Sequence, residues 1–71
     1  MVRIDGARLR DARNARLMTL RDLAAASGVQ HHTIHAIETG KQEPRPGTLR
    51  KLCEALGIDP AALVLPSSAP D

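Results

Sequence analysis

One short stretch, residues 19–40 (TLRDLAAASGVQHHTIHAIETG), places the strongest limit on the fold, because it contains two helix starts and two helix ends. Thr19 and Asp22 have the spacing of a capping box, in which each side chain bonds the other residue's backbone N–H. Gly28 can adopt the left-handed conformation that ends a helix, and Gly40 repeats that signal. The pattern predicts a helix over residues 20–27, a tight turn, and a second helix that begins near Gln30 or His31 and ends at Gly40.

The second of these helices has two unlike faces. At helical periodicity, Ile34 and Ile37 point to one side and form an apolar anchor. The opposite side carries mainly hydrogen-bonding groups, with one histidine at its edge: His31, His32, His35, Ala36 and Thr39. We therefore expect a short helix that is packed on one face and presents the other for recognition.

The remainder of the chain is also predicted to be helical. Asp5 is a suitable N-cap for a helix over residues 6–16. Pro46 suits the first position of a helix over residues 46–56, and Asp59-Pro60 suits the start of a short helix over residues 60–65. The expected fold is all-α, a compact five-helix bundle in one domain, residues 1–65. Residues 66–71 (PSSAPD) are expected to be a disordered C-terminal tail.

Composition narrows the class of protein. The chain has no aromatic residue, so a small core must be built from aliphatic side chains, which suits helices better than sheets. Residues 1–21 carry six arginines against two aspartates, whereas the net charge of the whole chain is only +2. A basic segment suits a polyanion, although many solvated helices look the same. The single cysteine, the lack of a signal region and the lack of a long apolar run favour a cytoplasmic protein without a membrane span.

The motif LxxLAxxxGVxxxTIxxIExG, residues 20–40, resembles the helix-turn-helix of the lambda-repressor and Cro family. Lys41, Pro44, Pro46, Leu49 and the run Ala55-Leu56-Gly57-Ile58 extend the resemblance, which covers about residues 5–65. It implies the lambda-repressor-like bundle and sequence-specific binding of double-stranded DNA through the major groove. It further implies a homodimer on a near-palindromic operator and a role as transcriptional regulator, expected to be a repressor.

The resemblance also implies roles for individual residues. The family's base-reading positions fall on His31, His32 and Ala36, with His35 beside them. The resemblance further implies a structural ion pair between Arg13 and Glu38. Contacts to the DNA phosphates are expected from a wider set: Thr19, Gln30, Thr33, Thr39, Lys41 and Arg45.

Three positions depart from the family pattern. Leu20 stands where a phosphate-bracing glutamine is common, and Gln30 opens the second helix where Ser or Thr is usual. Leu17 stands where a C-capping glycine is common. These departures affect docking on DNA more than the fold.

Several other interpretations compete with base reading. His31, His35 and Glu38 lie on one ridge and could hold a divalent ion, or the histidines could simply be solvated. Cys53 is interpreted as a core residue rather than a redox sensor. A protein-interaction module, antitoxin-like or adaptor-like, is the alternative function on the same fold. No catalytic constellation is present in the sequence, so neither an enzyme nor a cofactor is expected.

Overall fold

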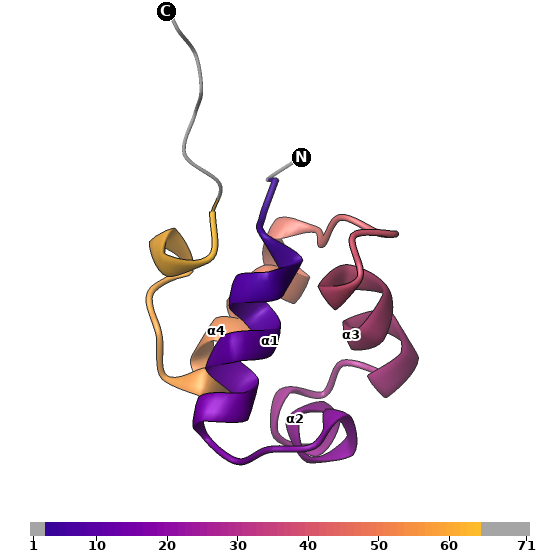
Figure 1. Ribbon diagram of the computed structural model, residues 1–71, viewed down its shortest axis with the longest axis vertical. Helices are drawn as coiled ribbons and strands as arrows, with labels where there is room; N and C mark the ends of the chain where they lie inside the picture. Colours follow the sequence, from indigo (N-terminus) through magenta and orange to yellow (C-terminus); the bar gives the residue numbers. More distant parts are fainter. Residues whose placement is uncertain (1–2, 65–71) are drawn as a thin grey trace, which may run out of the picture.

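The computed structural model describes residues 3–64, which form four α-helices and one short 3-10 helix (Figure 1). The α-helices are α1 (Gly6–Ala15), α2 (Leu20–Ser27), α3 (His31–Glu38) and α4 (Pro46–Leu56), and the 3-10 helix is η1 (Pro60–Ala62). Within residues 3–64 there is no strand, only an isolated antiparallel bridge between Ile4 and Val64. The all-α class predicted from the sequence is confirmed.

Within residues 60–64, the described part of the expected fifth helix over residues 60–65, the chain forms a single 3-10 turn, Pro60–Ala62. Leu65 lies outside the described residues. Asp59 caps the turn by accepting a hydrogen bond from the Ala61 N–H at 2.9 Å. The Leu63 and Val64 N–H groups both donate to the Pro60 carbonyl, at 3.0 and 3.2 Å, and Val64 then forms an antiparallel bridge with Ile4 in place of a further helical turn. Residues 3–64 therefore form four α-helices and a 3-10 turn, not the expected five α-helices.

Helix ends follow the capping residues closely. The Thr19 side chain accepts from the Asp22 N–H at 3.0 Å, while the Asp22 carboxylate accepts from the Thr19 N–H at 2.9 Å. Gly28 ends α2 in the left-handed region, at φ 77°. The helix that the sequence predicts up to Gly40 is α3, and its last helical residue is Glu38. Gly40 lies just beyond, in the left-handed conformation at φ 78°, and its N–H donates to the Ile37 carbonyl.

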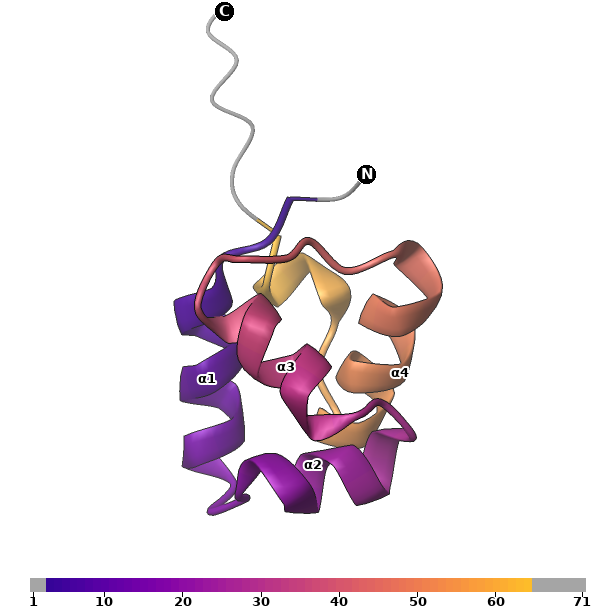
Figure 2. The same cartoon turned by 90° about the vertical axis from the view of Figure 1, so that its right-hand side faces the viewer.

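The four α-helices enclose one aliphatic core. Figure 2 shows α3 in front, between α1 and α4, with α2 crossing below. Each helix contributes fully or almost fully buried side chains, and η1 is followed by another: Leu9, Leu23, Ile34, Ile37, Leu49, Leu52, Cys53, Leu56 and Leu63. The core holds α3 by its inner face and leaves its outer face free.

The start of α1 packs directly on the end of α3. A Cβ atom added at Gly6 would lie 2.5 Å from the Glu38 carbonyl oxygen and would also overlap the Ile37 carbonyl oxygen. Only a residue without a side chain permits this approach. The partly positive N-terminus of α1 thus meets the partly negative C-terminus of α3, a favourable arrangement of helix dipoles.

The predicted domain, residues 1–65, extends slightly beyond the described range at both ends. The predicted tail, residues 66–71, lies outside it. Among the described residues, no helix is long and apolar enough to cross a membrane.

Candidate nucleic-acid interface

The two faces of α3 differ as sharply in the structure as in the sequence. Ile34 and Ile37 are buried, with 0% and 1% of their surface exposed. His32 and His35 are exposed, while His31 and Ala36 are half-buried at the two edges of the outer face. The four predicted base-reading residues therefore share the outer half of one anchored helix.

His31 and His32 also contact each other. Their ring centroids lie 5.7 Å apart at an interplanar angle of 83°, an edge-to-face arrangement. The two rings therefore lie close together at the start of α3.

An ion pair joins α1 to the last residue of α3. Arg13 Nε donates to Glu38 Oε2 at 2.7 Å, and its Nη2 donates to Oε1 at 3.0 Å. The third donor, Nη1, bonds the Met18 carbonyl at 2.8 Å. Both side chains are largely buried, at 12% and 4% exposure. The hydrogen bonds to Glu38 raise the pKa of Arg13 and so strengthen its charged state. The pair that the family resemblance implied is thus present.

The same ion pair weighs against a metal site on the histidine ridge. Both carboxylate oxygens of Glu38 accept hydrogen bonds from Arg13, so a metal ion could bind them only in competition with that pair. In residues 3–64, no group of three or more His, Cys, Asp or Glu side chains is placed to hold a metal ion.

Two threonines expected to contact phosphate have hydroxyls with partners inside the protein. The Thr19 hydroxyl accepts from the Asp22 N–H, and its hydrogen bond to the Asp22 carboxylate helps to lower the pKa of that group. The Thr39 hydroxyl donates to the His35 carbonyl at 2.9 Å. Because a phosphate oxygen only accepts hydrogen bonds, either hydroxyl can bind one only by giving up its internal acceptor.

The other expected phosphate contacts surround α3. Gln30 is exposed and caps α3 through its backbone only, without a side-chain cap bond. Lys41 is exposed just beyond the end of α3, and the exposed Arg45 precedes α4. Thr33 is half-buried on the flank of α3. The set is distributed around both ends of α3 and is not gathered into one cluster.

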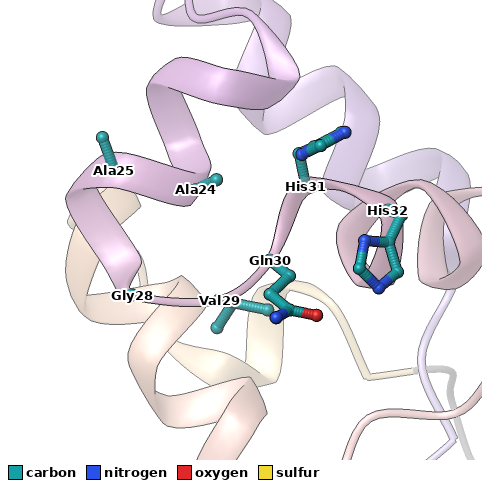
Figure 3. A pocket seen from close by; sticks show the side chains of 7 residues that line it. All are labelled: Ala24, Ala25, Gly28, Val29, Gln30, His31 and His32. Carbon is teal, nitrogen blue, oxygen red and sulfur yellow. The ribbon is translucent and has the colours of Figure 1, made fainter.

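A hollow of about 460 Å³ between α2 and the start of α3 is a feature that the sequence reasoning missed (Figure 3). Small side chains form its α2 side, and polar side chains stand at its α3 side; the lining residues are Ala24, Ala25, Gly28, Val29, Gln30, His31 and His32. The small side chain of Ala25 is exposed and leaves space beside the start of α3.

The unusual positions in the sequence have distinct structural consequences. Leu20 is half-buried and packs against the core, so it does not serve as a polar brace for phosphate. Leu17 adopts φ 56°, the left-handed conformation that favours glycine, and is 91% exposed. Cys53 is 2% exposed within the core, and burial raises the pKa of its thiol, which disfavours the reactive thiolate.

Comparison with known proteins identifies the family. A model of the helix-turn-helix domain matches residues 6–64, nearly all of the described chain. The chain belongs to the Cro/lambda-repressor-type helix-turn-helix DNA-binding family. Two Bacillus subtilis relatives match this helix-turn-helix domain over 54 residues, 75% of the chain. The transcriptional repressor RghR is 46% identical, and the uncharacterised transcriptional regulator RghRB is 43% identical. The matched segment spans only 40% and 39% of their lengths.

Solved structures share the same helix-turn-helix domain. The restriction-modification controller protein C.AhdI from Aeromonas hydrophila superposes with a TM-score of 0.78 at 32% identity, over 80% of this chain and 86% of that one. A transcriptional regulator from Vibrio cholerae superposes with a TM-score of 0.76 at 28% identity, over 80% of this chain and 32% of that one.

Proposed function

We propose that this domain binds double-stranded DNA in a sequence-specific manner and reads the major groove with the outer face of α3. One observation carries the proposal: α3 is anchored by two buried isoleucines while His32 and His35 project from its exposed face. Rigid presentation of a few polar groups on a helix is what major-groove reading requires. The names of the relatives, a transcriptional repressor and transcriptional regulators, support the same function.

The side chains of this face match the chemistry of base edges. A neutral imidazole offers one donor and one acceptor, and a charged imidazole offers two donors to the N7 and O6 acceptors of guanine. The Ala36 methyl group suits contact with the methyl group of thymine. His31, His32 and Ala36 are the residues we assign to base contacts, with His35 beside them.

The phosphate contacts that fix the register would come from residues around this face. Thr19 is at the start of α2, Gln30 and Thr33 are at the start of α3, and Lys41 and Arg45 lie in and beside the loop that follows α3. Thr39 joins them only if its hydroxyl turns away from α3. Contacts of this kind position the protein but carry no sequence information.

Our proposal includes a homodimer on a near-palindromic operator. One α3 reads only a few base pairs, so two copies related by two-fold symmetry would read half-sites roughly 34 Å apart along the duplex. The protein would act in the cytoplasm as a transcriptional regulator, a repressor by analogy with RghR, without catalysis.

Selection of bound duplexes from a random pool, followed by sequencing, tests the proposal. We expect enrichment of an inverted repeat with half-sites about one helical turn apart. If repeated rounds at about 0.1 M salt enrich no motif, sequence-specific binding is wrong. If they enrich only a single half-site, the homodimer is wrong.

His32→Ala tests base reading at α3. We expect loss of about 1–3 kcal/mol of binding free energy for the selected site and little change for unrelated duplexes. Glu54→Ala, an exposed change on α4, is the control. Equal weakening on all duplexes would contradict base reading by His32.

A protein-interaction module is the second candidate. Leu20, packed against the core where a phosphate brace is common, and a net charge of only +2 favour it. Unchanged DNA binding by His32→Ala, together with lost binding of a protein partner, would support this alternative.

A further inference from the structure

The arginines of α1 are equivalent in the sequence but not in the structure. Arg8 pairs with Asp5 at 3.7 Å. Arg13 is held by Glu38, and the guanidinium of Arg16, the C-cap residue of α1, donates to the Ala12 carbonyl at 3.1 Å. Arg10 is exposed and has no ion pair or side-chain hydrogen bond within residues 3–64. Of these four, only Arg10 has neither an ion pair nor a side-chain hydrogen bond within residues 3–64.

The position of Arg10 on α1 is defined by its neighbours one turn away. Gly6 and Arg13, which lie one turn before and one turn after it, both contact the end of α3. Leu9, the residue before it, is fully buried. Arg10 thus lies on the side of α1 that adjoins α3, but away from the core, at the surface edge of the contact between the two helices.

The same edge is bounded on α3 by an exposed histidine. His35 lies one turn before Glu38, the partner of Arg13, and it is exposed. Figure 2 shows α1 next to one end of α3, which runs obliquely to it. Arg10 and His35 therefore lie on either side of the contact between α1 and α3. Both are at the surface, next to the exposed outer face of α3.

From this arrangement we infer that Arg10 binds a backbone phosphate of the duplex whose major groove α3 reads, so that the interface extends from α3 onto α1. This inference rests on the proposed function. A guanidinium suits the partner, because its planar donors can bind phosphate oxygens in pairs. No acidic residue lies one turn from Arg10 on α1, where the neighbours are Gly6, Ala7, Arg13 and Asn14, so no carboxylate on that helix competes for it.

Arg8 provides a matched control. It lies on the same helix, is also exposed and carries the same charge, but two positions along a helix turn a side chain to the far flank. Arg8→Ala and Arg10→Ala therefore remove equal charge from opposite sides of α1. Any difference between them reports where the phosphates lie, not the net charge.

The test is a salt titration of binding to the duplex selected by the unmodified protein. Loss of one phosphate contact reduces the slope of log K against log[salt] by about 0.9. At 0.1 M salt this corresponds to about eightfold weaker binding for Arg10→Ala. We expect Arg8→Ala to keep the slope of the unmodified protein, Arg10→Lys to restore most of it, and the far-ultraviolet circular dichroism of all three to be unchanged.

Each outcome decides the inference. A reduced slope for Arg10→Ala but not for Arg8→Ala supports a phosphate contact at Arg10. Equal slopes for both variants overturn that contact while leaving the proposed function intact, because the unmodified protein still selects its site. Failure of the unmodified protein to bind any duplex overturns both proposals.

Discussion

Gly6 is the glycine at which an added side chain would have the least space. Replacing it with alanine would drive a methyl group into the Ile37 and Glu38 carbonyl groups, which are backbone and cannot move as a flexible side chain could. We expect Gly6→Ala to reduce the free energy of unfolding by about 2–3 kcal/mol, measured by urea denaturation.

Gly47 supplies the control for that change. It also lies within a helix, α4, but nothing stands within 4 Å of a Cβ added there. Gly47→Ala should stabilise the protein by up to about 1 kcal/mol through the better helix propensity of alanine. If the two variants are equally stable, the contact between α1 and α3 is looser than described.

Leu17 is a second strained position, because its backbone adopts a conformation that favours glycine. The left-handed conformation costs a residue with a side chain about 1–2 kcal/mol, and Leu17 gains no burial in return, being 91% exposed. Leu17→Gly should therefore raise the free energy of unfolding by about 1 kcal/mol, allowing for the entropy that glycine loses. Leu17→Ala retains the strain and should change stability little. Thermal unfolding measures both variants. A higher Tm for Leu17→Gly but not for Leu17→Ala shows that the gain comes from relief of backbone strain and not from loss of the leucine side chain.

Between elements, the main polar link is the ion pair that joins α1 to α3. Arg13→Ala would leave the Glu38 carboxylate, only 4% exposed, without its charged partner. We expect a loss of about 3–5 kcal/mol in chemical denaturation. Arg8→Ala, which breaks an exposed pair with Asp5, should change stability by less than about 1 kcal/mol. A loss of similar size in both variants would show that the buried pair has no special role.

The capping box of α2 predicts a dependence of stability on pH. Hydrogen bonds from the Thr19 backbone and side chain lower the pKa of Asp22 below its usual value of 3.8. A lowered pKa in the folded state stabilises the fold above the usual value, and that contribution disappears as pH falls through the lower one. The difference in unfolding free energy between the native chain and Asp22→Asn should be constant above about pH 5 and shrink below about pH 4. A difference that persists at pH 2 would contradict this assignment.

Across the whole molecule, the sequence predicted well those helix starts and ends that depend only on residues within one turn. α2 and α4 begin and end where the capping residues, prolines and glycines indicated, because those residues act on backbone within one turn. Of the predicted helix over residues 60–65, the described residues form only a 3-10 turn at Pro60–Ala62, and Val64 instead pairs with Ile4, which is far away in the sequence.

The candidate site shows the same division. The two faces of α3 followed from helical periodicity, since Ile34 and Ile37 are inside and His32 and His35 outside. The pairing of Arg13 with Glu38 came only from the resemblance to a family. The hollow beside Ala25 and the difference between Arg8 and Arg10 were not predictable, because they depend on which side chains meet across separate helices.

The bridge between Ile4 and Val64 brings the two ends of the described chain together, and the Asp5 N–H strengthens it by donating to the Leu63 carbonyl at 2.9 Å. Figures 1 and 2 show both ends of the described chain at the edge of the molecule opposite α2. A circularly permuted chain is therefore accessible, with a short linker between residues 3 and 64 and new ends opened in the exposed loop at residues 41–42.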